Sequence, residues 1–205
     1  MDFADRLRLP LSFDPARLER DLDALSGVAW IEHFVKQNYD GDWSVIPLRG
    51  VAGATHPVMM IYANPTATEF ADTPVLAPCP YFREVLAAFA CELQCVRLMR
   101  LTPGSVIKEH DDNDLDAANG VARIHIPVTT NPGVEFELNR RRIAMDPGSA
   151  WYLRLSDPHR VANKGTTDRV HLVIDAVVND WLTGLLRRAE AADTAGPASP
   201  WSLSS

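Results

Sequence analysis

Two histidines and one aspartate in the second half of the chain have the residue types and spacing of a metal site. His110 stands two residues before Asp112, and in extended backbone such positions project to the same face, so both side chains can converge on one ion. His159 follows a turn-like SDP segment at 156–158, where a strand end can deliver a third ligand. Two histidines and one carboxylate with open positions favour non-haem Fe(II). The alternatives are a chance His-x-Asp spacing and a turn residue at His159.

The acidic run DDNDLD at 111–116 suggests calcium as another ion. An EF-hand loop that starts at Asp112 needs glycine at its sixth position and a bidentate glutamate at its twelfth. The chain has Ala117 and Arg123 at these positions. The run therefore predicts a solvated loop rather than a calcium site.

Two β-rich runs carry an Arg-x-His pattern, at Arg123 and His125 and again at Arg169 and His171. In each run the Arg and His share one face of the strand, while the apolar residues between them share the other. An inward-facing guanidinium needs an anion because an unpaired buried charge is costly. Either an internal acid or a bound carboxylate ligand would serve. Arg169, ten residues after His159, is placed to hold the far end of a dicarboxylate that chelates iron.

The elements that must position these residues change period along the chain. Helical spacing of apolar residues predicts helices over 14–27 and 81–93 and a short amphipathic helix over 180–191, whereas 50–80 is loop-rich. WSVIPL (43–48) is a further strand candidate. Six short β-rich runs from residue 95 onward predict a sandwich or barrel: CVRLMRL (95–101), VARIHIPVT (121–129), VEFEL (134–138), RIAM (142–145), AWYLRL (150–155) and RVHLVIDAV (169–177).

The composition is that of one ordinary globular domain. The chain has 205 residues with a formal net charge of -7, which argues against a broad basic surface for nucleic acid. The N-terminus lacks the apolar region of a signal peptide and no segment predicts a membrane span, so we expect a cytoplasmic protein with no membrane partner. Three cysteines fit reduced thiols rather than a disulfide framework. No feature specifies an oligomeric state.

Three segments together resemble a known family. They are the His-x-Asp at 110–112, RIHIPVTTNPGVEF (123–136) and GSAWYLRLSDPHRVANKGTTDRVHLVID (148–175). In combination and spacing they resemble the aspartyl/asparaginyl β-hydroxylase family of Fe(II)/2-oxoglutarate dioxygenases, including its bacterial L-proline cis-4-hydroxylase branch. The resemblance covers about 95–182, with weaker similarity at GDWSVIPL (41–48).

The resemblance implies a mainly β fold, a double-stranded β-helix (jelly roll, cupin-like) with flanking α-helices. We expect a single dioxygenase domain over 1–191, with its β-helix core at about 95–178. The remaining residues, 192–205, are rich in Ala, Pro, Ser and Thr, which predicts a disordered tail.

The resemblance also implies roles for individual residues. The iron ligands would be His110, Asp112 and His159. Arg169 would bind the distal carboxylate of 2-oxoglutarate, Arg123 and His125 would contact cosubstrate or substrate carboxylate, and Arg97 would lie on the substrate side. Asn163 matches the motif without a physical role that the sequence supplies. His33 and His56 fall outside the motif and are expected to be surface or loop residues.

The implied activity is Fe(II)- and 2-oxoglutarate-dependent hydroxylation of an amino acid or a similar small molecule, with O2 as oxidant and ascorbate as a stimulant. Some peptide-acting members lack the carboxylate ligand, so Asp112 favours the branch that acts on free amino acids. Two alternatives stay open: an Asp/Asn β-hydroxylase of peptides or proteins, and a non-catalytic cupin-like module that binds a metal or ligand.

Overall fold

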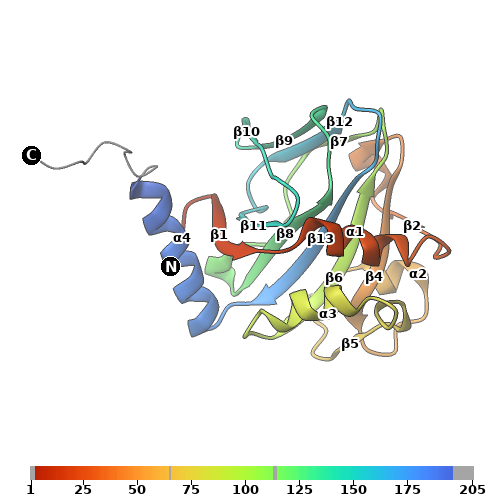
Figure 1. Cartoon of the computed structure of the whole chain (residues 1–205), viewed down its shortest axis with the longest axis horizontal. Helices are drawn as coiled ribbons and strands as arrows, with labels where there is room; N and C mark the ends of the chain where they lie inside the picture. Colours follow the sequence, from red (N-terminus) through yellow and green to blue (C-terminus); the bar gives the residue numbers. More distant parts are fainter. Residues whose placement is uncertain (1–2, 65, 113–114, 196–205) are drawn as a thin grey trace, which may run out of the picture.

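The computed structural model describes residues 3–64, 66–112 and 115–195 (Figure 1). Its α-helices are α1 (Pro15–Asp23), α2 (Pro57–Ile61), α3 (Pro80–Ala87) and α4 (Asp180–Ala195), with 3-10 turns η1 (Lys36–Asn38), η2 (Pro74–Leu76) and η3 (Ala117–Asn119). Its strands are β1 (Arg6–Ser12), β2 (Ile31–Glu32), β3 (Tyr39–Asp40), β4 (Trp43–Val51), β5 (Phe70–Asp72), β6 (Leu93–Leu101), β7 (Val106–His110), β8 (Val121–Thr129), β9 (Val134–Leu138), β10 (Arg141–Ile143), β11 (Ser149–Leu153), β12 (His159–Asn163) and β13 (Arg169–Val177).

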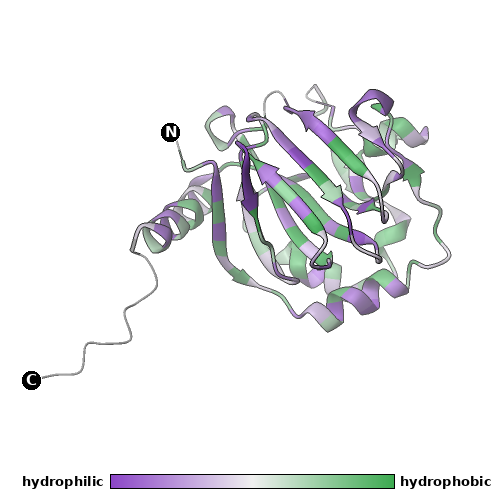
Figure 2. Ribbon diagram, turned by 90° about the horizontal axis from the view of Figure 1, so that it is seen from above, coloured by the Kyte–Doolittle hydropathy of each residue, from purple (hydrophilic) through white to green (hydrophobic). Residues whose placement is uncertain are grey.

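These strands form two sheets in which all pairings are antiparallel. The larger sheet has the order β1-β11-β8-β13-β6-β4-β2, with β5 paired to β4, and the smaller has the order β10-β9-β12-β7-β3. The two sheets face one another as the layers of a jelly roll, with helices on the outside (Figures 1 and 2). This arrangement confirms the predicted mainly β class with flanking helices.

Strand alternation divides the apolar side chains into two cores. On β8, Ile124, Ile126 and Val128 pack in a cluster with residues of α1, α3 and α4, on the outer side of the larger sheet. A second cluster lies between the sheets and includes Met99 from β6 and Phe136 from β9. Because Arg123 and His125 alternate with the first set, they point between the sheets, as the sequence predicts.

The structure refines several predicted boundaries. Asp14 caps α1, since its Oδ1 accepts from the backbone N–H of Ala16 at 2.9 Å. The helix predicted to reach residue 93 ends at Ala87, and this part of the prediction was wrong: Leu93 instead starts β6 and pairs with Ala176 of β13. The pairing outweighs the helical spacing because it extends a central strand of the larger sheet.

The C-terminal helix is longer than predicted. α4 continues to Ala195, so the expected tail does not begin at residue 192, and its remainder over 196–205 lies outside the described residues. Within the described ranges, none of the helices has the length and apolar character needed to cross a membrane. The three cysteines are free thiols.

Candidate metal centre and ligand pocket

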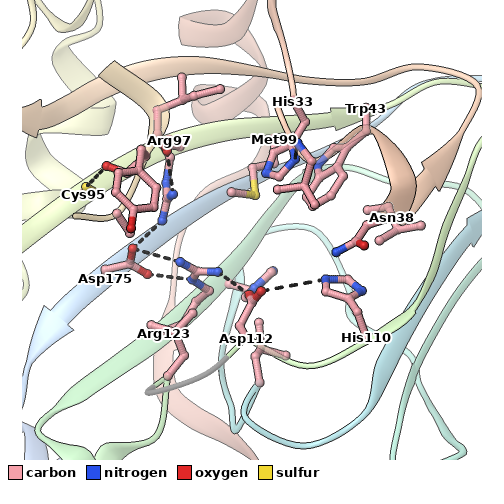
Figure 3. Close-up of a pocket in the computed structure, with 18 of the residues that line it drawn as sticks. His33, Asn38, Trp43, Cys95, Arg97, Met99, His110, Asp112, Arg123 and Asp175 are labelled. Carbon is pink, nitrogen blue, oxygen red and sulfur yellow. Dashed lines mark hydrogen bonds and ion pairs between the residues drawn. The ribbon is translucent and has the colours of Figure 1, made fainter. Parts of the chain in front are cut away.

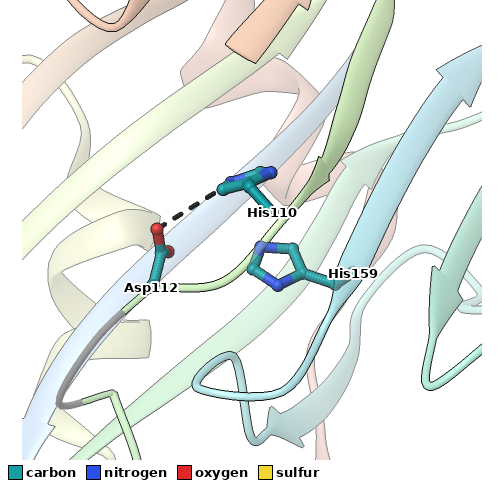
Figure 4. Close-up of side chains that lie close together, drawn as sticks. All are labelled: His110, Asp112 and His159. Carbon is teal, nitrogen blue, oxygen red and sulfur yellow. Dashed lines mark ion pairs between the residues drawn. The ribbon is translucent and has the colours of Figure 1, made fainter.

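Pairing between β7 and β12 brings the two candidate histidine ligands together. His110 ends β7 directly opposite His159, which begins β12, and their ring centroids lie 4.3 Å apart. Asp112 follows β7, where its backbone N–H donates to the carbonyl of Leu155 at 2.8 Å. One ligand atom from each of the three side chains lies within 4.8 Å of the other two (Figure 4). The structure therefore assembles the predicted triad.

Backbone carbonyls fix the orientation of both imidazoles. His110 Nδ1 lies 2.7 Å from the carbonyl oxygen of Lys108, and His159 Nδ1 lies 3.0 Å from that of Asp157. A carbonyl oxygen accepts, so each Nδ1 carries the proton and each Nε2 keeps its lone pair for a metal. Burial lowers the pKa of His159, which favours this neutral form. The donor set and its outer hydrogen bonds fit a divalent transition metal.

The triad borders a cavity of about 490 Å3 between the two sheets (Figure 3). One wall is aromatic: the ring of His33 stacks on Trp43 with centroids 3.5 Å apart, and Trp43 lies 6.3 Å from His110. Burial lowers the pKa of His33 to about 3, so this ring is uncharged. This wall lies beside the His110 ring of the triad.

Arg169 lies in the same cavity without an acidic partner among the described residues. Its side chain is 2% exposed, and its Nε has no hydrogen-bond partner there. Its Nη2 donates to Nδ1 of His171 at 2.8 Å. Burial lowers the pKa of Arg169 to about 9. A cation buried in this way needs an anion, and the described side chains supply none.

The contact to Arg169 also sets the tautomers of the two neighbouring histidines. Because the guanidinium donates, Nδ1 of His171 must accept, and Nδ1 of His125, 3.3 Å away, must donate to it. His125 then keeps an unprotonated Nε2, which is buried and has no partner among the described residues. His125 thus lines the Arg169 end of the cavity, as a lone-pair acceptor in this state.

The other two inward arginines share one internal acid. Asp175 is 1% exposed and accepts from Nη2 of Arg97 and, in a bidentate contact at 2.7 and 3.0 Å, from Nε and Nη2 of Arg123. Although burial opposes ionisation, the guanidiniums of Arg123 and Arg97 hold the pKa of Asp175 below its ordinary value. The sequence allowed either an internal acid or a bound carboxylate as the partner of an inward arginine. The internal acid Asp175 is the partner of Arg97 and Arg123, but not of Arg169.

All seven residues predicted for the site line this one cavity: Arg97, His110, Asp112, Arg123, His125, His159 and Arg169. Sequence reasoning missed Asp175. The available signal was its position four residues after His171 on the same strand, which places both side chains on one face. His33 lies in a loop, as expected, but it lines the cavity instead of facing away from it.

Asn163 has a structural role that the sequence did not supply. Its Nδ2 donates to the carbonyl oxygens of Leu101 and Thr167, each at 2.9 Å, and its Oδ1 accepts from the backbone N–H of Gly165. These bonds tie the turn between β12 and β13 to the end of β6. Asn163 therefore supports the strand that carries Arg169.

The buried histidines predict a loss of stability in acid. The pKa values of His125 and His171 are held well below 6.5, mainly by burial and next by Arg169, so below pH 6.5 the unfolded chain binds protons that the folded chain does not. Each histidine should cost about 1.4 kcal/mol of unfolding free energy per pH unit as the pH falls below that value. Urea denaturation from pH 7 to pH 5 measures this slope.

His171→Asn, which keeps an acceptor for Arg169, should make that slope shallower. His56→Asn is the matched control, because His56 is exposed at the start of α2 and its side chain makes no capping bond there. Equal slopes in the two variants would contradict the assignment to buried neutral histidines.

Comparisons with known proteins identify relatives of this chain. An L-proline cis-4-hydroxylase of Rhizobium meliloti (strain 1021) is 28% identical over 182 residues, which cover 88% of this chain and 63% of that protein. An L-proline cis-3-hydroxylase 1 of Streptomyces sp is 25% identical over 168 residues, covering 80% of this chain and 57% of that protein. The chain thus spans less than two thirds of the length of these curated relatives.

A solved structure and a family model complete the comparison. HygX from Streptomyces hygroscopicus, solved with nickel and 2-oxoglutarate bound, superposes with a TM-score of 0.51 at 14% identity, over 86% of this chain and 84% of that one. This likeness confirms the double-stranded β-helix. The model of the aspartyl/asparaginyl β-hydroxylase family matches residues 15–178, most of the chain. The predicted resemblance is confirmed: the chain belongs to the aspartyl/asparaginyl β-hydroxylase family.

Proposed function

We propose that the protein is an Fe(II)- and 2-oxoglutarate-dependent hydroxylase of an amino acid or a similar small molecule. It would couple oxidative decarboxylation of 2-oxoglutarate to succinate and CO2 with hydroxylation of a substrate C–H bond. The observation that carries this proposal is Arg169, a buried guanidinium without an acidic partner among the described residues, in the same cavity as the His110, Asp112 and His159 triad. A cation at one end and a metal at the other suit a chelating dicarboxylate.

In this proposal His110, Asp112 and His159 would hold Fe(II), which would supply O2 activation coupled to oxidation of 2-oxoglutarate, and ascorbate would stimulate turnover. Arg169 binds the distal carboxylate of 2-oxoglutarate, and His125 lines that end of the cavity. The stacked rings of His33 and Trp43 exclude water from the reacting side. No side chain acts as nucleophile or general base.

Charge balance supports a substrate with a carboxylate. Apart from the exposed Asp111, the cavity holds three arginines and two aspartates, so one positive charge is left over. A divalent metal raises this to three, and dianionic 2-oxoglutarate lowers it to one. A substrate carboxylate on Arg97 would balance the remainder, with Arg123 close by because both arginines contact Asp175. The two relatives named for L-proline make a small amino or imino acid the first candidate.

The other candidate functions predict different substrates or different site residues. An Asp/Asn hydroxylase of peptides would use the same metal and cosubstrate but would respond only to peptide. A cupin-like binding module has no use for a buried cation ten residues beyond the last histidine ligand. A cytoplasmic location stays a prediction.

The test is succinate formation from 2-oxoglutarate with Fe(II) and ascorbate, across free amino acids including L-proline and one Asp/Asn-containing peptide. We expect stimulation by a free amino acid, its loss in His159→Ala, and its retention in the exposed control His56→Ala. Stimulation by peptide alone would replace the substrate class. No stimulation, together with no binding of Fe(II) or 2-oxoglutarate, would favour the binding module.

A further inference from the structure

Arg123 makes one contact that cosubstrate or substrate binding does not explain. Its Nε and Nη2 donate to the carboxylate of Asp175, and its third nitrogen, Nη1, donates to Oδ2 of Asp112 at 2.8 Å. Figure 3 shows the resulting row, in which Arg97 and Arg123 meet at Asp175 and Arg123 reaches on to Asp112. Every nitrogen of this guanidinium is therefore occupied by a carboxylate.

The contact leaves the two oxygens of Asp112 in different positions. Oδ2 is bound to Arg123, whereas Oδ1 faces Nε2 of His110 at 3.8 Å, a separation that leaves room for an ion between them. The Asp112 side chain is 32% exposed, but that of Arg123 is 8% exposed and is itself fixed by Asp175. The partly exposed carboxylate of Asp112 is thus held by the buried guanidinium of Arg123, which Asp175 immobilises.

We propose that Arg123 is a positioning residue for the metal: it holds Asp112 so that Oδ1 alone is offered to the ion. The inference rests on the proposed metal centre and goes beyond it, because it gives Arg123 a role that precedes any cosubstrate or substrate. Groups that orient a metal ligand from outside affect affinity strongly, typically by about 10- to 100-fold.

The sign of the effect separates positioning from simple electrostatics. A guanidinium repels a nearby metal cation, so its removal should strengthen metal binding if charge alone matters. If Arg123 positions Asp112, its removal should weaken metal binding despite the relief of repulsion. The two mechanisms therefore predict opposite changes in the dissociation constant.

Arg97 provides a matched control. Like Arg123 it is a buried arginine on the larger sheet and is bound to Asp175, and its Nη1 donates to the carbonyl of Ile61 at 2.9 Å. Unlike Arg123, it has no contact with Asp112 in the described structure. Arg97→Gln and Arg123→Gln each leave Asp175 with one arginine.

The experiment titrates the metal-free full chain with Co(II), without 2-oxoglutarate or substrate, and follows the visible absorption of the bound ion. We expect Arg123→Gln to weaken Co(II) binding at least about 10-fold and Arg97→Gln to change it less than about 3-fold. If the wild type binds Co(II), equal weakening by both variants would overturn the inference. Unchanged or tighter Co(II) binding in Arg123→Gln would overturn it as well. Absence of Co(II) binding by the wild type would overturn the proposed metal centre itself.

Two further variants guard against misfolding. Arg123→Lys keeps the charge but loses the fork, so it should bind Co(II) more tightly than Arg123→Gln and more weakly than the wild type. In an Asp112→Ala background, Arg123→Gln should no longer weaken binding, because no carboxylate is left to position. A persistent loss in that background would identify a general structural defect and contradict the proposal.

Discussion

Replacing Arg169 by methionine is expected to raise the KM for 2-oxoglutarate at least about 100-fold and, at the same time, to stabilise the ligand-free protein. The KM rises because two charge-assisted hydrogen bonds to the distal carboxylate are lost, each worth about 1.5–3 kcal/mol. The ligand-free protein gains because a buried cation without an acidic partner in the described structure is replaced by an apolar side chain. Steady-state succinate assays and thermal unfolding without ligand measure the two effects.

Stabilisation should appear as a Tm increase of about 3–6 °C. Arg100→Met is the control: Arg100 lies on the neighbouring strand β6 but outside the cavity, and its guanidinium lies over the ring of Trp30 at 4.6 Å. That variant should leave the KM unchanged and lower the Tm. If Arg169→Met had a normal KM, Arg169 would not bind the cosubstrate. If Arg169→Met also had a lower Tm, the positive charge of Arg169 would already be compensated in the ligand-free protein.

Asp112→Ala is expected to lower substrate-coupled succinate formation at least about 1000-fold, because the metal loses the one carboxylate ligand that the described residues supply. The same variant should retain little metal after dialysis, which elemental analysis of the purified protein measures. Retained turnover in the iron-loaded variant would show that the two histidines suffice.

The neighbouring carboxylate supplies the control for this prediction. Asp111 borders the same cavity but is exposed and lies outside the cluster of ligand atoms. Asp111→Ala should therefore keep its metal and its turnover within about 3-fold of the wild type. If both variants lost metal equally, general loss of negative charge rather than ligation would be the cause.

Much of the candidate site could be predicted from local sequence because strand geometry is local. The alternation of residues along β8 and β13 places Arg123, His125, Arg169 and His171 between the sheets and their apolar neighbours against the helices. The His110-x-Asp112 spacing likewise requires only that the backbone be extended. These faces follow from the two-residue period of a strand, whatever the partner strands are.

The strands that complete the site were harder to predict. β7 and β12 each have only five residues and carry polar side chains such as Glu109 and Arg160, so neither forms an apolar run. They exist because each pairs with neighbours on both sides in the smaller sheet. Pairing in the larger sheet likewise ended α3 early, because Leu93 starts β6 and pairs with Ala176 of β13.

The sequence by itself determined the kinds of groups available: an imidazole and carboxylate set for a metal, inward arginines for anions, and the β-rich pattern and motifs of the family. Only the tertiary structure decided how these groups are partnered. It placed His110 opposite His159, paired Asp175 with both Arg97 and Arg123, and left Arg169 without an acidic partner among the described residues. The physical reason is that strand faces depend on local geometry, whereas charge pairing depends on distances between segments far apart in the chain, which no local pattern encodes.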